Sequence, residues 1–160
     1  MQYRKAKPED ASGIGLVLKE SYNIDSVKEG EAVFSSEISK GHQYIVAVDD
    51  SGKTVGIATW LSHGLPKHGL FELDRIAILP KFRGKGIAKD LFAALIADAQ
   101  RWYRARRAKA RKLYILTHAE NKRAQEFYKK MGCLHEAILP KHYYDNTDEY
   151  VFSLFLDIMN

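Results

Sequence analysis

Six residues, Arg83-Gly84-Lys85-Gly86-Ile87-Ala88, constrain the fold most, because they join an apolar run to a long amphipathic stretch. The run Leu70–Leu79, ended by Pro80, predicts a strand, and the apolar spacing after Ile87 predicts a helix. A loop between a strand and a helix exposes the unpaired N–H groups of the first helical turn, which can bind an anion. Two glycines let the backbone approach that anion closely. The sequence therefore predicts a strand–loop–helix unit that fits a pyrophosphate.

The same loop also has a simpler interpretation, which the six residues leave open. It lacks the Gly-Lys-Ser/Thr ending of a nucleotide-triphosphate loop and the glycine spacing of a dinucleotide-binding fold. A basic, glycine-containing turn without any ligand has the same composition. The loop alone does not decide between the two.

Patterns along the rest of the chain predict alternating helices and strands. Helices are expected near Pro8–Tyr22, over Lys28–Lys40, after Ile87 and after Asn121, which can cap its helix. Further strands are expected at Tyr44–Val48, Thr54–Leu61, Leu113–Thr117, Leu134–Ile138 and Glu149–Leu156, with one more open at the N-terminus. No linker or repeat interrupts this order. We therefore expect a single mixed α/β domain over residues 1–160.

The basic character of the chain is local. Lys and Arg number 25 against 20 Asp and Glu, a net charge of +5. Residues 101–112 hold seven basic residues and no acid, so the remainder has 18 basic against 20 acidic residues. This basic segment, with its interleaved aromatics, could bind RNA or a ribosomal surface. The alternative, which we favour, is the solvated end of a long helix, so we do not expect a nucleic-acid partner.

Several classes of protein are excluded by what the sequence lacks. The single cysteine, Cys133, can form neither an internal disulfide nor a thiolate metal site. The six histidines show no metal-ligand spacing, so we expect no metal. The N-terminus has no apolar signal region, and no apolar run is long enough to span a bilayer. We expect a soluble cytoplasmic protein with no membrane partner.

Two motifs in this order resemble the GNAT superfamily of acyl-CoA-dependent N-acyltransferases. The first, Arg/Gln-x-x-Gly-x-Gly/Ala, is matched by Arg83, Gly86 and Ala88. The second, Asn-x-x-Ala-x-x-Phe-Tyr-x-Lys-x-Gly, is matched from Asn121 to Gly132. The element order over about residues 2–157 fits as well. Cys133 departs from the family, which often has an aromatic residue there; this affects packing more than chemistry.

The resemblance implies a fold and a cofactor. The fold is a twisted, mostly antiparallel sheet of about seven strands with a splayed central pair, flanked by about four helices. Acetyl-CoA, as co-substrate, would lie between the splayed strands. Its pyrophosphate would meet the backbone of Arg83, Gly84, Lys85, Gly86, Ile87 and Ala88. Its pantetheine amides would pair with Ile76, Ala77 and Ile78. Asn121 would contact the cofactor arm, and Tyr128 would lie near the thioester sulfur.

Amine acetylation needs a proton donor for the leaving thiolate and a route for the proton of the amine. The phenol of Tyr128 suits the first task. Without the motif a core aromatic would be the preferred interpretation of Tyr128, and the motif reverses that preference. Period-two alternation puts residues 72, 74, 76 and 78 on one face of their strand. Glu72 and Asp74 are therefore both candidates for the base. Counting back from Gly86, Glu72 falls where some family members with protein substrates carry a catalytic glutamate, so the resemblance makes Glu72 the first candidate and Asp74 a weaker one. Simple exposure at the start of the strand, or a water chain as in many family members, are the alternatives.

These observations together predict direct transfer of an acetyl group to a primary amine in a ternary complex. The Tyr143-Tyr144 pair resembles family members that acetylate protein N-termini, so a peptide or protein amine is narrowly preferred to a small polyamine-like amine. The acids Glu20, Asp25, Glu29, Glu31 and Glu37 could instead attract a polyamine. The rivals are an RNA- or ribosome-associated module using residues 101–112, and an acyl-CoA-binding protein without catalysis. A homodimer is left open.

Overall fold

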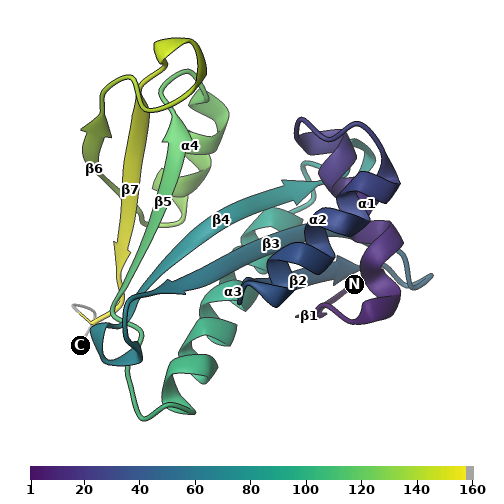
Figure 1. Ribbon diagram of the computed structural model, residues 1–160, viewed down its shortest axis with the longest axis horizontal. Coiled ribbons are helices and arrows are strands. Elements are labelled where there is room, and N and C mark those ends of the chain that lie inside the picture. Colours follow the sequence, from purple (N-terminus) through teal and green to yellow (C-terminus); the bar gives the residue numbers. More distant parts are fainter. Residues whose placement is uncertain (158–160) are drawn as a thin grey trace. The chain divides into compact units, whose positions relative to one another are not determined.

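The computed structural model describes residues 1–157, so the last three residues of the expected domain lie outside the described part. These residues form a mixed α/β fold with a seven-stranded sheet in the order β1-β2-β3-β4-β5-β7-β6 (Figure 1). The pairs β1·β2, β2·β3, β5·β7 and β6·β7 are antiparallel, and β4·β5 is parallel. The predicted fold class, with seven strands and four α-helices in the described residues, is confirmed.

The chain divides into two compact units, of which the first comprises residues 1–61 and 75–99. It holds β1 (Gln2–Lys5), a short 3₁₀ turn (Pro8–Asp10), α1 (Ala11–Ser21), α2 (Val27–Ser39), β2 (Gln43–Val48), most of β3 (Thr54–His63), the end of β4 (Leu70–Ile78), the turn Pro80–Phe82 and most of α3 (Ile87–Arg104). The second unit comprises residues 62–74 and the chain from residue 100 onward.

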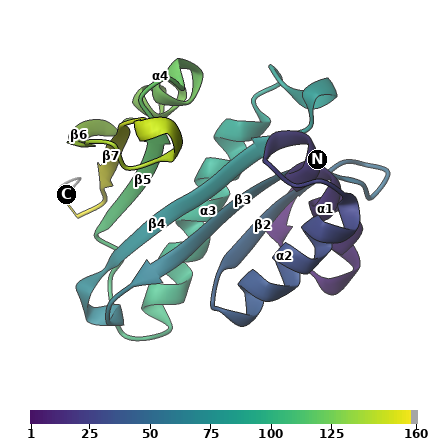
Figure 2. The same ribbon diagram turned by 45° about the horizontal axis from the view of Figure 1, so that its top comes forward.

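In the first unit, α1 and α2 cover one face of β2 and β3, and α3 covers the other (Figure 2). The two N-terminal helices cross where Gly15 meets Gly30. A Cβ on Gly30 would stand only 2.6 Å from the carbonyl oxygen of Gly15, so the crossing depends on glycine at this point. Beneath it, Ile14 and Leu18 pack with Phe34 in a buried cluster. This packing fixes α1 and α2 on the sheet.

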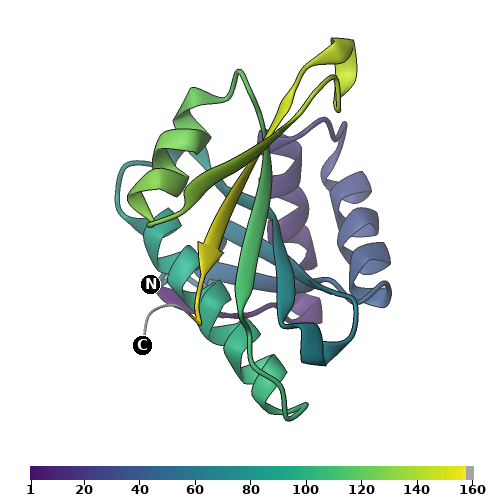
Figure 3. The same ribbon diagram turned by 90° about the vertical axis from the view of Figure 1, so that its left-hand side faces the viewer.

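The second unit holds the ends of β3 and α3, the start of β4, and a C-terminal set of elements. These are the turn Pro66–His68, β5 (Lys112–His118), α4 (Lys122–Lys130), β6 (Leu134–Leu139), the turn Tyr144–Asn146 and β7 (Glu149–Phe155). Register within this unit is set by β5, which pairs with β7 over all seven of its residues and with β4 through Leu70–Glu72 (Figure 3).

The two faces of β5 have different surroundings. The ring of Tyr128 on α4 lies 6.0 Å from that of Phe152, which stands opposite Ile115 in the ladder. Since opposed residues share a face and neighbours alternate, Ile115 faces α4 and Tyr114 faces away from it. Tyr114 stands opposite Glu72 in the parallel ladder, so Glu72 shares that second face. Tyr128 and Glu72 therefore lie on opposite faces of this unit.

Most predicted element boundaries agree with the structure to within two residues, and the open question of an N-terminal strand is answered by β1. One predicted pattern changes along β4. Exposure alternates from Leu70 to Asp74 and then stops, since Arg75 and Ile76 are both half-buried. The backbone N–H of Arg75 donates to the side-chain hydroxyl of Thr59 at 3.0 Å. The alternation of exposure seen from Leu70 to Asp74 therefore does not continue to Ile78.

Among residues 1–157, no helix combines the length and the apolar character that crossing a membrane requires.

Candidate functional site

The glycine loop has an open backbone. Gly84 and Gly86 adopt φ values of 76° and 80°, which other residues rarely adopt. A Cβ on either glycine would have no described atom within 4 Å apart from its sequence neighbours. Helix α3 begins at Ile87, and the N–H of Asp90 already donates to the carbonyl of Gly86 at 3.2 Å. The earlier N–H groups of the first turn therefore face an open approach.

Basic residues of the loop have different tasks. The Nε of Arg83 donates to the carbonyl oxygen of Ile78 at 3.0 Å, which ties the loop to the end of β4. The ammonium of Lys85 lies 5.3 Å from the ring centre of Phe82, and Lys85 is exposed. Arg83 thus positions the loop, whereas Lys85 remains placed to meet an anion.

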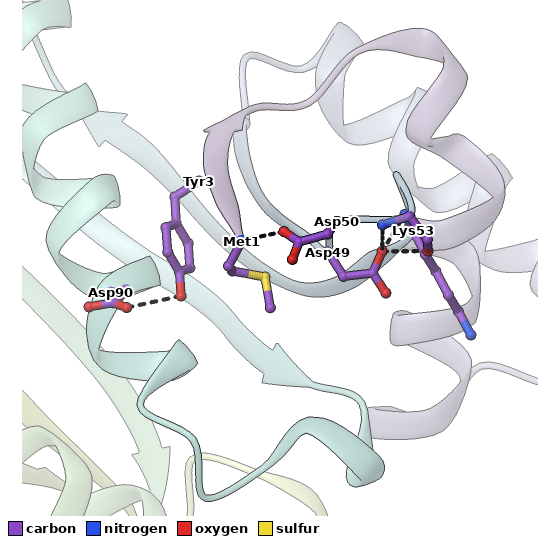
Figure 4. A network of polar contacts seen from close by, with 7 residues as sticks. Met1, Tyr3, Asp49, Asp50, Lys53 and Asp90 are labelled. Atoms are coloured by element: carbon purple, nitrogen blue, oxygen red, sulfur yellow. Dashed lines mark hydrogen bonds and ion pairs between the residues drawn. The ribbon is translucent and has the colours of Figure 1, made fainter.

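The N-terminal strand β1 contacts the first turn of α3 through a side-chain hydrogen bond (Figure 4). The hydroxyl of Tyr3 donates to a carboxylate oxygen of Asp90 at 2.9 Å, and burial together with this carboxylate raises the pKa of Tyr3 to about 12. The phenol therefore stays a donor at every ordinary pH. In the same region the N-terminal ammonium of Met1 contacts Asp50 at 2.8 Å. The carboxylate of Asp90 beside the loop therefore already has the hydroxyl of Tyr3 as a hydrogen-bond partner.

The residues predicted to meet the pantetheine lie at the end of β4. Ile76 is half-buried, and Ala77 and Ile78 are buried. The hydroxyl of Tyr22, the residue that follows α1, lies 3.4 Å from the carbonyl oxygen of Ile76. Sequence reasoning missed Tyr22, because nothing in its helical spacing indicates a contact 54 residues further along the chain.

In the second unit Glu72 is part of a cluster that the sequence did not indicate. Its Oε2 lies 2.8 Å from Nε2 of His63 and accepts a hydrogen bond from the hydroxyl of Tyr114 at 3.2 Å. Burial and the adjacent carboxylate raise the pKa of Tyr114, so its hydroxyl remains a donor. His63 and Tyr114 could have been found only from the register of β4 with β5 and from the return of the β3–β4 connection.

Asp74, the weaker candidate, is an exposed residue of β4. By alternation it lies on the same face as Glu72. The structure therefore brings the first candidate base into a hydrogen-bonded cluster, and it leaves the second nearer to solvent.

Tyr128 is a buried residue with 6% of its surface exposed. Its ring lies 5.6 Å from that of Phe127 and 6.0 Å from that of Phe152, so it is also part of the core beneath α4. Asn121 caps α4 as predicted, its side-chain oxygen accepting from the N–H of Ala124 at 3.1 Å. Both residues thus have a structural task beside the role that the motif suggests.

A pocket of about 400 Å³ opens beside Asn121 in the second unit. Its lining includes both tyrosines of the last connection, with His118, Glu120, Asn121, Asp145 and Thr147. The ring of Tyr143 lies 3.8 Å from that of His118 and 4.6 Å from that of Tyr144. Tyr144 is 75% exposed. An aromatic wall with an acidic rim, free of Lys and Arg, can accept a polar or cationic group.

The basic segment 101–112 is partly engaged within its own unit. The guanidinium of Arg106 stacks on Trp102 at 3.6 Å from the ring centre, and that of Arg111 donates twice to the carbonyl of His68. Lys112 pairs with Glu136 at 2.7 Å. The segment begins in the last turn of α3, as the interpretation as a helix end predicts, and it then runs on to the first residue of β5.

The glycine loop, with the start of α3, fits the pyrophosphate of acetyl-CoA. Two glycines with positive φ, open space above them and the free N–H groups of an 18-residue helix suit a pyrophosphate. Side chains at either glycine would narrow this approach.

Comparison with known proteins gives a consistent picture. A family model described as an acetyltransferase (GNAT) domain matches residues 40–132, which include parts of both units. No curated protein sequence matches the chain. An N-acetyltransferase from Staphylococcus aureus has a similar structure, with 24% identity, a TM-score of 0.76 and coverage of 97% of this chain and 98% of the other.

Two further structures are similar in fold. A mutant spermidine N-acetyltransferase from Vibrio cholerae has 18% identity and a TM-score of 0.76, covering 97% of this chain and 95% of its own. A phosphinothricin acetyltransferase from Sinorhizobium meliloti, in complex with acetyl-CoA, has 20% identity and a TM-score of 0.75, covering 97% and 88%. Since the family match covers more than half of its 160 residues, the chain belongs to the GNAT family and is an acetyl-CoA-dependent N-acetyltransferase.

Proposed function

We propose that this enzyme transfers the acetyl group of acetyl-CoA directly to a primary amine of a peptide or protein. The observation that carries the choice of acceptor is the pocket beside Asn121, whose wall is formed by Tyr143, Tyr144 and His118. Tyrosines grip a peptide through hydroxyl hydrogen bonds and ring contacts. Because Asn121 also belongs to the motif for the cofactor arm, an acceptor held in this pocket would be close to the acyl donor.

A polyamine acceptor has less support from the first unit. Two of the acids that could attract it already have internal tasks. Glu29 accepts from the backbone N–H of Asp25 at 2.7 Å, and Glu37 pairs with Arg75 at 2.5 Å. The charge of Glu37 is therefore offset by Arg75, and the carboxylate of Glu29 is held by its own backbone, so we propose the peptide class over the polyamine class.

Each group of residues in the site has its own proposed role. The loop from Arg83 to Ala88 binds the pyrophosphate through backbone N–H groups, and Ile76–Ile78 offer the pantetheine their backbone groups. Tyr128 donates a proton to the departing thiolate. The amine loses its proton towards the cluster at Glu72, and Asp74 is the weaker candidate. Holding the two reactants together supplies much of the rate by itself.

We also propose that residues 1–160 act as one acetyltransferase domain. The support is the family match to residues 40–132. This stretch lies alternately in the first unit, the second, the first again and the second again. Neither unit contains both motifs, since the glycine loop lies in the first and the Asn121–Gly132 motif in the second.

The test is release of the CoA thiol from acetyl-CoA with a panel of amines. The panel contains peptides with free N-termini, the same peptides with blocked N-termini and a free lysine, and spermidine. We expect turnover with at least one peptide at a higher kcat/KM than with spermidine. Turnover with spermidine alone would overturn the proposed acceptor class. No turnover with any amine, combined with steeply salt-dependent RNA binding, would favour a role for the basic segment instead.

A further inference from the structure

A three-residue cluster in the second unit is unexplained by the motifs of the family. His63 ends β3, Glu72 lies near the start of β4, and Tyr114 lies in β5. Both hydrogen bonds of the cluster converge on one atom, Oε2 of Glu72, at 2.8 Å from His63 and 3.2 Å from Tyr114. The rings of His63 and Tyr114 lie 5.3 Å apart. All three residues belong to the same compact unit.

The chemistry of a carboxylate fixes the proton on the imidazole. An ionised carboxylate only accepts hydrogen bonds, so Nε2 of His63 carries the hydrogen that points at Glu72. Nδ1 then holds the lone pair. Among residues 1–157, no group hydrogen-bonds to this nitrogen, and the side chain of His63 is 36% exposed. The cluster therefore presents a basic nitrogen outward and a carboxylate behind it.

The imidazole is a better proton acceptor for an amine than the carboxylate behind it. Carboxyl side chains ordinarily titrate near pH ~4 and imidazoles near ~6.5, whereas amines titrate at about 8 to 10. A base is most effective when its proton affinity is close to that of the reacting group at the working pH.

We propose that His63, oriented by Glu72, takes the proton of the attacking amine at Nδ1, and that Glu72 and Tyr114 are positioning residues. This rests on the proposed acetyl transfer to an amine. It moves the proton-accepting atom from the carboxylate of Glu72 to the ring of His63. The carboxylate then stabilises the imidazolium, as a buried acid does behind a catalytic histidine.

The step balances in bonds and protons. The amine nitrogen forms a bond to the acetyl carbon, and the bond between that carbon and sulfur breaks. The proton leaves the amine for Nδ1 of His63 and passes on to solvent. The thiolate takes the hydroxyl proton of Tyr128, which solvent replaces.

Other ionisable groups lie on the two strands that carry the partners of His63. Tyr114 keeps its proton, because burial and Glu72 raise its pKa. Lys112 lies on the same face of β5 but is paired with Glu136. On β4, Asp74 follows Glu72 on the same face. Of these acids, Glu72 is the one whose carboxylate contacts the ring in the described structure.

Two substitutions separate His63 from Glu72. In His63→Gln the new amide can still donate to Glu72, but the basic nitrogen is gone. In Glu72→Gln the imidazole keeps an acceptor for Nε2 and loses only the negative charge. The control is His68→Gln, a histidine of the same connection whose Nδ1 accepts from the N–H of Leu65 at 3.2 Å. Each variant is checked for folding by circular dichroism.

The measurement is the pH dependence of kcat at saturating concentrations of acetyl-CoA and of the best amine of the panel, because kcat/KM also falls as the free amine itself becomes protonated. In the wild-type enzyme and in His68→Gln we expect the rate to fall on the acid side as one group becomes protonated. His63→Gln should lose this acid limb and about 100-fold in kcat, with the KM for acetyl-CoA unchanged. Glu72→Gln should keep the limb and move it to lower pH, since a neighbouring negative charge has been removed.

The opposite pattern overturns the proposal. If His63→Gln retains the acid limb while Glu72→Gln loses it, the carboxylate is the base. A spectroscopic test does not depend on turnover. The imidazole ¹⁵N shifts of His63 at high pH should show the tautomer with hydrogen on Nε2, and the other tautomer contradicts the proposal. Failure of the wild-type enzyme to acetylate any amine would instead contradict the proposed function and leave this spectroscopic result to be judged separately.

Discussion

Nε2 of His63 lies 2.8 Å from Oε2 of Glu72, although nine residues and a 3₁₀ turn separate the two in sequence. The contact joins the end of β3 to the start of β4 within the second unit. It places a basic ring in front of the acid that the sequence singled out. The acid is therefore part of a hydrogen-bonded cluster and not a lone carboxylate.

Removing the hydroxyl of Tyr128 should slow the chemical step. We expect Tyr128→Phe to lower kcat by between about 10- and 100-fold and to leave the KM for acetyl-CoA nearly unchanged, because the phenol acts on the leaving thiolate and not on binding. The matched control is Tyr150→Phe, a half-buried tyrosine of β7 whose ring stacks on His135. Equal kinetics for Tyr128→Phe and the wild-type enzyme would rule out the proton-donor role.

A methyl group on the glycine loop should weaken cofactor binding specifically. Gly86→Ala places a Cβ at a φ of 80° and above an open backbone, so it costs strain and blocks the approach of the pyrophosphate. We expect the Kd of acetyl-CoA to rise about tenfold or more, measured by calorimetry. Gly52→Ala is the control, since Gly52 has a φ of 83° and equally open surroundings in the β2–β3 turn. If both variants weaken binding equally, the loop has no special role.

The carboxylate of Asp10 should stabilise the first unit in a pH-dependent way. Burial opposes its ionisation, but two hydrogen bonds from Arg4, at 2.7 and 3.0 Å, and one from the N–H of Lys7 outweigh burial and hold the pKa of Asp10 below its usual range. We expect Asp10→Asn to lower the free energy of unfolding by about 2 kcal/mol at neutral pH.

The sign of the pH dependence follows from the lowered pKa. The stabilisation is complete above the unfolded pKa, near ~3.9, and disappears as the pH falls through the lower folded value. The difference between wild type and Asp10→Asn in urea denaturation should therefore be constant from roughly pH 5 to 8 and shrink below about pH 4. Asp50→Asn, at an exposed ion pair, should change little. A difference that persists undiminished in acid contradicts the account.

The only thiol should be unreactive in the folded protein. Cys133 is buried, and burial raises its pKa to about 11, so it stays protonated at pH 8. We expect alkylation by iodoacetamide to be negligible in native buffer and complete in denaturant, as measured by intact mass. Rapid modification of the native protein would show that the core beneath α4 opens readily.

Sequence patterns predicted most of the fold because its elements are strongly amphipathic. The helix after Ile87 and the strand Leu70–Ile78 bear long apolar patterns that only one local structure satisfies. The crossing of α1 and α2 at Gly15 and Gly30 was not predicted, since a close approach of two backbones leaves no periodic signal in either helix. Tertiary packing determines that contact.

The candidate site was predictable in part for the same reason. The loop from Arg83 to Ala88 and the cap at Asn121 are local features, and their residues are contiguous. His63 and Tyr114 contact Glu72 through strand register and a returning connection, which no window of sequence contains. Tyr22 reaches Ile76 in the same way. Side chains that meet from separate elements are the part that needed the structure.

Mass analysis of both the acceptor and the enzyme during turnover tests the central claim most directly. Direct transfer in a ternary complex predicts that the acceptor amine gains one acetyl group for each CoA thiol released, while the enzyme keeps its own mass at every time point. Thiol release without an acetylated acceptor would contradict the account, as would an acetylated enzyme that forms before the acceptor is added and then transfers its acetyl group to it.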